Sequence, residues 1–385
     1  MLTRQSFSGG GSRNLDSNIR ISAFTQLNWI FARLAEAIGE AQAEMTGIMF
    51  KRIKKLWITC LVLFLILSAV FIFFIRKPAG VVEPQEIKWG VAFSKYFTEK
   101  LGLDWQDTYS AILNDLKPKY LRLPIYWQDV EPQSGVYNFS DYDWMVSEAQ
   151  KRNVKLILVI GRKMPRWPEC HLPAWAVSLS EGSQQTRLLK VIPEIVDHYK
   201  NLDNLYLWQV ENEPFLPFGE CPRWSADFLD KEIELVRSLD QTHKIIITDS
   251  GELSFWLPSA KRADVFGTTM YRVIWNKYLG YFKYPLPPRF FWLKANLVHL
   301  FYPSKAIVVS ELQAEPWARN MPYETPLAEQ FKSMDFNQFK ENIAYARQVG
   351  FPAVYLWGAE WWYWLKTKHN DERFWEAARE IISPN

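Results

Sequence analysis

Two glutamates each close an apolar run that predicts a buried strand. One run ends in residues 208–214 (WQVENEP) and the other in residues 308–313 (VVSELQ). Glycoside hydrolysis requires paired carboxylates, because one protonates the departing oxygen while the other attacks the anomeric carbon or activates water. Either glutamate alone would also fit a helix cap or an ion pair with an arginine. Their shared position at strand ends favours the catalytic interpretation for Glu213 and Glu311.

The elements that must position these glutamates alternate regularly. From residue 87 onward, short β-branched or apolar runs alternate with longer amphipathic runs, which is typical of βα units around a parallel sheet. We expect eight strands, at residues 87–94, 119–125, 154–160, 204–210, 244–249, 264–271, 305–311 and 353–358. We expect helices at residues 105–116, 142–152, 185–200, 225–239, 339–349 and 371–382. Eight repeats predict an α/β fold, namely a (β/α)8 TIM barrel.

The alternative is a doubly wound open sheet. The first strand is not followed by a G-x-G-x-x-G sequence, so the usual dinucleotide site of that fold is missing. In a closed barrel, strands four and seven face one another across the lumen, and chemistry takes place where the strands end. The barrel therefore brings Glu213 and Glu311 to the same face.

These residues resemble the retaining glycoside hydrolases of clan A, which include the family 5 cellulases and mannanases and family 39. The resemblance covers about residues 86–385, and its most specific element is Asn212-Glu213-Pro214 together with Glu311. It implies that Glu213 is the general acid/base and Glu311 the nucleophile. It also implies that Asn212 donates a hydrogen bond to the 2-hydroxyl of the sugar, a contact that strengthens in the transition state.

Other strand ends extend the resemblance. Arg122 matches an arginine that holds the nucleophile ionised, Tyr271 a tyrosine that hydrogen-bonds the nucleophile, and Trp357 a tryptophan that floors the sugar site. Where family 5 has histidines after strand three and before the strand-six tyrosine, this chain has residues 161–163 (GRK) and Thr269. The resemblance therefore implies the mechanism of the clan and does not identify the substrate.

Aromatic residues are abundant in the predicted loops. The chain has 19 tryptophans, and aromatic rings pack against the C–H faces of sugars while carboxylates bind their hydroxyls. We predict that Glu315 is one such hydroxyl partner. The predicted strand-to-helix loops hold Trp127, Trp275 and Trp317, which we predict to bind substrate, and also Trp167, Trp175, Trp361, Trp362 and Trp364.

The three cysteines and five histidines bear on stability and cofactors. Cys170 and Cys221 lie in the neighbouring loops after strands three and four, so outside the cytoplasm we expect them to form a disulfide. Cys60 falls in an apolar segment. The histidines are scattered without ligand spacing, so we predict no metal site and no cofactor.

The net charge of +3 is the sum of two segments whose net charges have opposite sign. Residues 1–85 carry ten Lys and Arg against five Asp and Glu, whereas residues 86–385 carry 35 against 37. The barrel segment therefore lacks the basic balance that binding to a phosphate backbone favours. We expect a carbohydrate substrate and no nucleic-acid partner.

A membrane segment precedes the barrel. Residues 56–75 form an uncharged apolar run, about 30 Å long as a helix, which matches a bilayer core. Four basic residues precede the run and two follow it, which places the N-terminus in the cytoplasm and the barrel outside. We predict a signal anchor. A cleaved signal peptide and a buried core helix are the alternatives.

We thus expect four parts: a cytoplasmic segment (1–50), a signal-anchor transmembrane helix with a basic flank (51–77), a linker (78–86) and the barrel (87–385). In the first part, Phe24, Leu27, Ile30 and Phe31 would share one helical face, and residues 8–12 are rich in glycine. Met45 and Met49 are alternative start sites. The predicted function is a membrane-anchored, extracytoplasmic retaining glycoside hydrolase. The alternatives are an inactive glycan-binding barrel and a transglycosylase of envelope polysaccharide assembly, and the sequence does not indicate the oligomeric state.

Overall fold

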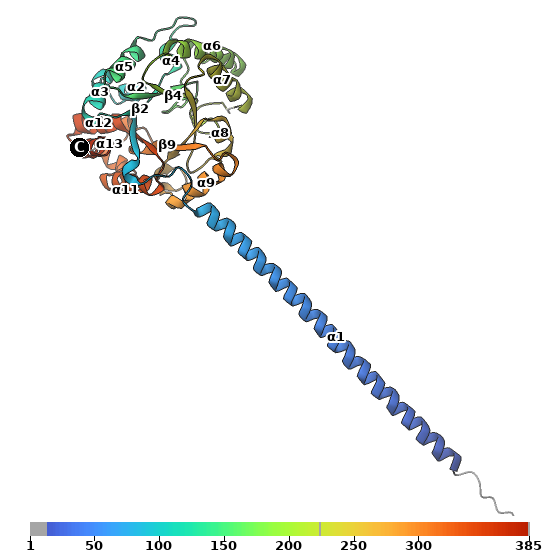
Figure 1. The fold of residues 1–385 in the computed structure, drawn as a ribbon. Coiled ribbons are helices and arrows are strands. Elements are labelled where there is room, and N and C mark those ends of the chain that lie inside the picture. Colours follow the sequence, from blue (N-terminus) through green and yellow to red (C-terminus); the bar gives the residue numbers. More distant parts are fainter. Residues whose placement is uncertain (1–13, 223–224, 384–385) are drawn as a thin grey trace, which may run out of the picture. The chain divides into compact units, whose positions relative to one another are not determined.

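The computed structural model describes residues 14–222 and 225–383, with side chains from residue 28 onward (Figure 1). It divides into two compact units, Met1–Ile72 and Phe73–Asn385. Phe24 and Leu27, which we predicted to share a helical face, lie outside the residues whose side chains are described. The glycine-rich residues 8–12 lie outside the residues whose backbone is described.

The first unit consists of one long helix. Helix α1 runs over Asn14–Ile75, so it continues without a break across the boundary expected after residue 50. In the part of the chain that the structure describes, this is the single helix whose length and apolar composition suffice to cross a membrane. Its large apolar side chains, such as Leu56, Trp57 and Phe64, are exposed.

The second unit is a closed parallel barrel of eight strands (Figure 1). The strands are β1 (Lys88–Ala92), β2 (Tyr120–Pro124), β3 (Lys155–Ile160), β4 (Leu205–Val210), β5 (Lys244–Asp249), β6 (Val265–Met270), β9 (Ala306–Gln313) and β10 (Ala353–Trp357). Their order around the barrel is that of the sequence, and β10 closes the ring on β1. The predicted (β/α)8 fold and all eight strands are confirmed.

The strands are apolar on both faces because each face is covered. Ile157, Leu207, Ile246 and Tyr355 form the core inside the barrel. The side chains that point outward, such as Leu158 and Trp208, pack against the surrounding helices. This burial on both sides explains the near-continuous apolar runs in the sequence.

Helices follow the strands and cover the barrel. They are α2 (Lys95–Lys100), α3 (Trp105–Ala111), α4 (Trp127–Val130), α5 (Ser140–Lys151), α6 (Glu181–Tyr199), α7 (Ala226–Leu239), α8 (Leu257–Arg262), α9 (Pro288–Phe301), α10 (Leu327–Gln330), α11 (Phe336–Val349), α12 (Ala359–His369) and α13 (Arg373–Ile382), with a π-helical turn at Ile112–Leu116 and 3-10 turns at Pro84–Glu86, Ala174–Ala176 and Pro322–Glu324. Side-chain oxygens cap several of them; Ser180, for example, accepts from the backbone N–H of Ser183 at the start of α6.

Several elements differ from the sequence prediction, among them a hairpin and the helix that follows β10. A small antiparallel hairpin, β7 (Val273–Asn276) with β8 (Gly280–Lys283), interrupts the pattern after β6. The tryptophans at 361, 362 and 364 lie in helix α12, so their predicted position in a loop is wrong. Trp361 and Trp362 are fully buried, because their rings pack against Phe374 and Phe339 and their N–H groups donate to Gln330 and to the carbonyl of Ala314.

Candidate active site

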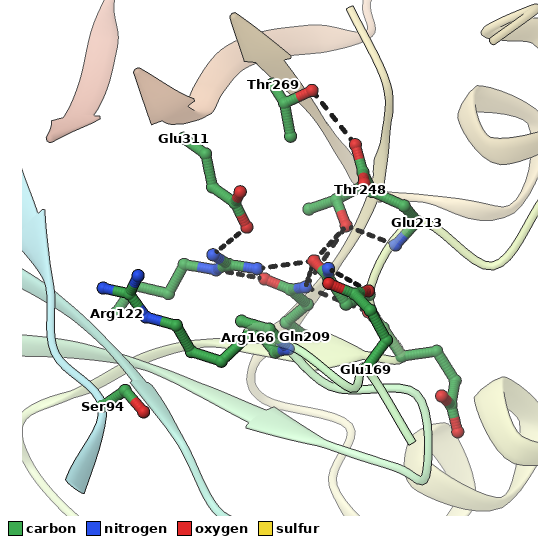
Figure 2. A network of polar contacts seen from close by, with 12 residues as sticks. Ser94, Arg122, Arg166, Glu169, Gln209, Glu213, Thr248, Thr269 and Glu311 are labelled. Atoms are coloured by element: carbon green, nitrogen blue, oxygen red, sulfur yellow. Dashed lines mark hydrogen bonds and ion pairs between the residues drawn. The ribbon is translucent and has the colours of Figure 1, made fainter. Parts of the chain in front are cut away.

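Arg122 on β2 holds the carboxylate of Glu311 at the end of β9 (Figure 2). Arg122 Nη1 donates to Glu311 Oε1 over 2.6 Å, and Tyr271 OH donates to Glu311 Oε2 over 2.9 Å. The other nitrogens of Arg122 donate to Gln209 and Asn212, and its side chain is fully buried. Both oxygens of Glu311 therefore accept from donors that compensate a negative charge. The two contacts predicted for Arg122 and Tyr271 are present.

Glu213 follows β4 and is held by two threonines of the next strands. Thr248 Oγ1 on β5 accepts from the backbone N–H of Glu213 over 3.0 Å, and Thr269 Oγ1 on β6 donates to Glu213 Oε1 over 3.0 Å (Figure 2). Burial raises the pKa of Glu213 well above its usual value, and the negative charges of Glu311 and Glu169 raise it further. A raised pKa favours the protonated form of Glu213, which suits a general acid.

The backbone before Glu213 is held in a rare conformation. Glu211 (φ 59°) and Glu213 (φ 44°) both adopt positive φ, which side chains other than glycine seldom do. The carboxylate of Glu211 accepts from the backbone N–H groups of Arg162 and Lys163, and Lys163 Nζ donates to the carbonyl of Glu213. These bonds tie the loop after β3 to the loop after β4, so they fix the direction of the Glu213 side chain.

Asn212 is placed below the surface of the site by its partners. Its Oδ1 accepts from Arg122, and its Nδ2 donates to Glu169 Oε2 over 3.3 Å. Asn212 is 2% exposed and is absent from the lining of the cleft, whereas Glu169 belongs to that lining. The side chain that the cleft presents at this position is therefore that of Glu169, which the sequence had not indicated.

An arginine occupies the aromatic face expected for a sugar. The guanidinium of Arg166 lies 3.9 Å from the ring centroid of Trp357 and 3.7 Å from that of Phe97. It also pairs with Glu315 and Glu360. Trp357 does line the cleft, but a sugar can stack on the face that Arg166 covers only if Arg166 moves.

A cleft of about 660 Å³ opens above these groups. Of the predicted substrate-binding residues, it is lined by Glu213, Glu311, Tyr271, Trp275, Trp317, Glu315 and Trp357. Burial raises the pKa of Glu315 to about 7, although the charge of Arg166 opposes the shift. The size suits an oligosaccharide segment, since ligand clefts usually measure about 300–1,000 Å³.

The prediction that Trp127 binds substrate is wrong. It lies in α4, is fully buried, and donates from Nε1 to Glu131 Oε2 over 2.7 Å. Its ring packs edge to face against Trp175. A ring without exposed surface cannot stack on a sugar, so Trp127 is part of the core and does not bind substrate.

Cys170 and Cys221 form a disulfide that joins the loops after β3 and β4. The predicted pair is therefore present, next to Glu169 in the sequence. No group of three or more His, Cys, Asp or Glu side chains within residues 28–222 and 225–383 is arranged to hold a metal ion. The polar side chains that line the cleft are carboxylates, hydroxyls, amides and arginines.

Comparison with known proteins agrees with this geometry. A model of glycosyl hydrolase family 10 matches residues 123–251, a third of the chain that includes β3, β4, β5 and Glu213. The match agrees with the structure, which is a parallel barrel with one glutamate at the end of its fourth strand and another at the end of its seventh strand. The chain is therefore similar to the clan A (β/α)8 glycoside hydrolases in its fold and in its two strand-end glutamates.

The relatives that this chain matches are distant. It is 29% identical over 159 residues to a β-1,4-xylanase of Dictyoglomus thermophilum, and 28% identical over 155 residues to endo-1,4-β-xylanase C of Phanerodontia chrysosporium. The matches cover 40% and 37% of this chain, and only 42% and 36% of the two relatives' own lengths. A solved structure, xylanase 10B of Thermotoga maritima, is 16% identical with a TM-score of 0.45, covering 71% of this chain and 83% of that one.

Sequence reasoning missed two charged residues that line the cleft. Glu169 and Arg166 lie in the loop after β3, where no periodic pattern predicts which side chains point into the cleft. A signal was present, because Cys170 adjoins Glu169 and its predicted disulfide already placed this loop beside the one that carries Glu213.

Proposed function

We propose that this protein hydrolyses β-glycosidic bonds with retention of anomeric configuration. The observation that carries the proposal is the contrast between its two glutamates. Glu311 receives hydrogen bonds from Arg122 and Tyr271 on both oxygens, whereas burial and neighbouring carboxylates raise the pKa of Glu213 well above its usual value. A nucleophile requires donors that stabilise its carboxylate, and a general acid requires a raised pKa.

In the first step, Glu311 attacks the anomeric carbon. The carbon–oxygen bond to the leaving sugar breaks, and the proton of Glu213 passes to the departing oxygen. Thr269, which donates to Glu213 Oε1, keeps the carboxyl directed toward that oxygen. The product of this step is a glycosyl ester on Glu311 and an ionised Glu213.

In the second step, Glu213 acts as a base. It takes a proton from water, whose oxygen attacks the anomeric carbon while the ester bond to Glu311 breaks. Arg122 and Tyr271 then stabilise the carboxylate that returns. If a sugar hydroxyl replaces water, the same residues transfer the glycosyl group instead.

The proposed substrate is a β-1,4-linked polysaccharide or oligosaccharide. The matched relatives are xylanases that act on β-1,4 bonds by name, and the cleft presents Trp275, Trp317 and Trp167 as aromatic surfaces. Trp167 is 39% exposed, so its ring is accessible to a sugar face.

The test combines kinetics with product stereochemistry. Glu311→Gln should lower kcat by roughly 10⁴-fold or more, and Glu213→Gln by about 10² to 10⁴-fold, on aryl β-glycosides and β-1,4-glucans or xylans. The matched control, Glu380→Gln, removes an exposed carboxylate on α13 and should leave kcat unchanged. NMR of the first product formed should show the β anomer. An α anomer would contradict the double-displacement mechanism.

We also propose that α1 anchors the barrel to a membrane, with the barrel on the extracytoplasmic side. Support comes from the exposed apolar side chains of α1, from the basic residues Lys51, Arg52, Lys54 and Lys55 before the apolar run, and from the disulfide, which suits an oxidising compartment. Proteinase treatment of intact cells should digest the barrel, whereas a protected barrel would contradict this orientation. Mass determination of the purified N-terminus distinguishes an anchor from a cleaved signal peptide.

A further inference from the structure

The face of the barrel opposite to the cleft is rich in lysine. All eight strands are parallel, so they all begin at this face, which we call the N-terminal face. Four of its lysines, Lys88, Lys119, Lys155 and Lys244, are exposed, and Lys305 is half-buried. Each of the five is the first residue of a strand or directly precedes one, namely β1, β2, β3, β5 and β9. In the part of the chain that the structure describes, none of the five has a carboxylate oxygen within 4.0 Å, so their charges are available to a partner.

The segments that lead into the strands carry an excess of positive charge. They are residues 76–88, 117–120, 152–155, 200–205, 240–244, 263–265, 302–306 and 350–353, each counted to the first residue of its strand. Together they hold ten Lys and Arg against five Asp and Glu, whereas residues 86–385 as a whole hold 35 against 37. Seven of the ten basic side chains and three of the five acidic ones form no ion pair with an oppositely charged Lys, Arg, Asp or Glu side chain. The excess therefore remains after the ion pairs are left out, and the N-terminal face is basic although the barrel as a whole is slightly acidic.

Aromatic and apolar side chains are exposed on the same face. Tyr206 on β4 is 39% exposed, and its ring centroid lies 5.5 Å from that of Tyr120 on β2. Lys155 Nζ lies 5.8 Å from the ring centroid of Tyr206. Leu300 and Phe301, the last two residues of α9, are 55% and 58% exposed beside the segment that leads into β9. Lysine combined with tyrosine and exposed apolar residues is typical of surfaces that bind the boundary between lipid headgroups and acyl chains.

The residues that follow the apolar run of α1 are held on this face. Asn296 Nδ2 on α9 donates to the carbonyls of Phe74 and Arg76, over 2.9 Å and 2.8 Å. Further along the chain, the N–H of Val82 donates to the carbonyl of Gly350, in the segment before β10, over 2.8 Å. All five residues belong to the second compact unit. A chain that leaves a bilayer after residue 75 therefore enters the barrel at the N-terminal face and not beside the cleft.

We infer that the N-terminal face of the barrel binds the surface of a bilayer that contains anionic lipids. This inference rests on the proposed membrane anchor, because the anchor brings the bilayer next to this face. The five lysines compensate the charge of lipid phosphates, while Leu300 and Phe301 enter the headgroup region. With this face on the bilayer, the cleft opens away from the lipid. The barrel then acts on polysaccharide that lies outside the headgroup layer.

The test measures how close each end of the barrel lies to lipid. The full-length protein carrying Cys60→Ser is placed in nanodiscs of phosphatidylcholine alone, or of an equal mixture of phosphatidylcholine and phosphatidylglycerol. A fluorophore is attached to Ser304→Cys, at an exposed position before β9, and is quenched by spin-labelled headgroups in the discs. The same fluorophore on Ser178→Cys, at an exposed position between β3 and α6, is the control for the opposite end of the barrel.

Quenching at position 304 should be about twofold stronger or more in the discs that contain phosphatidylglycerol, because the anionic headgroups attract the lysines. High salt should return it to the value in phosphatidylcholine, since salt screens exposed charges. Quenching at position 178 should stay low in both lipid compositions. Lys119→Glu combined with Lys155→Glu should abolish the effect of phosphatidylglycerol. The matched control is Lys190→Glu with Lys231→Glu, which makes the same change in net charge at exposed positions of α6 and α7 and should leave the effect in place.

Equal quenching at position 304 in the two lipid compositions would overturn the inference, and so would an effect of phosphatidylglycerol that survives Lys119→Glu with Lys155→Glu. Failure of the anchor has a different signature, because the protein would then elute apart from the discs in size-exclusion chromatography, and the inference would fall with it. Failure of the proposed catalytic function would instead appear as unchanged turnover of aryl glycosides in the Glu213 and Glu311 variants. That outcome does not depend on the lipid composition.

Discussion

The guanidinium of Arg122 and the carboxylate of Glu311 meet at 2.6 Å although β2 and β9 are not neighbours in the barrel. The same guanidinium reaches Gln209 and Asn212 from β4 and the loop that follows it. Arg122 is thus the centre of a polar network that connects the positions of Glu213 and Glu311 (Figure 2). Because the network is buried, its members depend strongly on one another.

Arg122→Lys should lower both activity and stability. A lysine cannot donate to Glu311, Gln209 and Asn212 at once in the planar geometry of arginine. We expect kcat to fall by about 10² to 10³-fold, as when a preorganised donor is lost. We also expect the free energy of unfolding to fall by about 3 kcal/mol or more, because partners of a buried charge are left unpaired. Steady-state kinetics and urea denaturation measure the two effects.

The matched control for this variant is Arg373→Lys. Arg373 pairs with Asp371 through Nε and Nη2, at 2.8 Å and 2.7 Å, but its side chain is 59% exposed. Surface pairs contribute about 0–1 kcal/mol, so both kcat and the free energy of unfolding should stay close to those of the unaltered protein. If Arg122→Lys behaved like this control, the central role of Arg122 would be wrong.

Tyr271→Phe isolates one hydrogen bond to the nucleophile. The hydroxyl of Tyr271 donates to Glu311 Oε2, and its ring packs edge to face on Trp317. Phenylalanine keeps the ring and removes the donor, so the fold should be unaffected. Loss of one hydrogen bond to a charged group should lower kcat by roughly 10- to 100-fold. Unchanged kcat with an intact near-UV circular dichroism spectrum would show that the bond does not serve catalysis.

The pH dependence of activity should depend on Glu213. Since its pKa is raised, the proton needed by the leaving group is lost at a higher pH than from an ordinary glutamate. Activity on 4-nitrophenyl glycosides, whose cleavage benefits from the acid, should therefore fall on the alkaline side. A 2,4-dinitrophenyl leaving group departs without a proton, so the Glu213→Gln variant should still cleave such glycosides. The activity of this variant should not decrease at alkaline pH. An alkaline fall that persists in this variant would assign the acid to another residue.

The barrel was predictable from the sequence because its strands are buried on both faces. Runs such as residues 155–160 (KLILVI) are almost wholly apolar, and Glu213 and Glu311 come directly at strand ends. The hairpin β7–β8 was missed because its residues, partly exposed, lack a strict alternation. Trp127 was misassigned because a tryptophan after a strand looks the same in sequence whether its ring faces the cleft or the core. Glu169 and Arg166 depend on loop geometry, which local residue patterns do not encode.

Reduction of the disulfide should weaken the fold. Cys170 and Cys221 are 51 residues apart, and closing a loop of that length stabilises a protein by up to about 4 kcal/mol. Cys170→Ser with Cys221→Ser should lower the free energy of unfolding by this amount or less, measured by urea denaturation. Cys60→Ser, which alters the free and exposed cysteine of α1, is the control and should leave that energy unchanged. Mass spectrometry without reduction should find one free thiol, and three would contradict the bridge.

Stability should fall as the pH rises from about 6.5 to 8. Burial raises the pKa of Glu169 and of Glu252 to about 8, so the folded protein keeps protons that the unfolded chain releases near pH 4.3. Because the unfolded state binds fewer protons in this interval, the free energy of unfolding decreases with pH, by up to about 1.4 kcal/mol per pH unit and group. His171, whose pKa burial lowers to about 4, acts in the opposite direction only below its usual value near 6.5.

Lys294 likewise changes the pH dependence of stability only above this interval, because burial lowers its pKa to about 8 and its ordinary value is 10.5. Urea denaturation at pH 6.5, 7.0, 7.5 and 8.0 would therefore measure the carboxyls largely alone. Glu252→Gln removes one of them and keeps an oxygen that can accept from the backbone N–H of Tyr271, so it should flatten the slope. The exposed variant Glu380→Gln should not. A stability that rises over this interval would mean that Glu169 and Glu252 are ionised in the folded protein, which would contradict their raised pKa values.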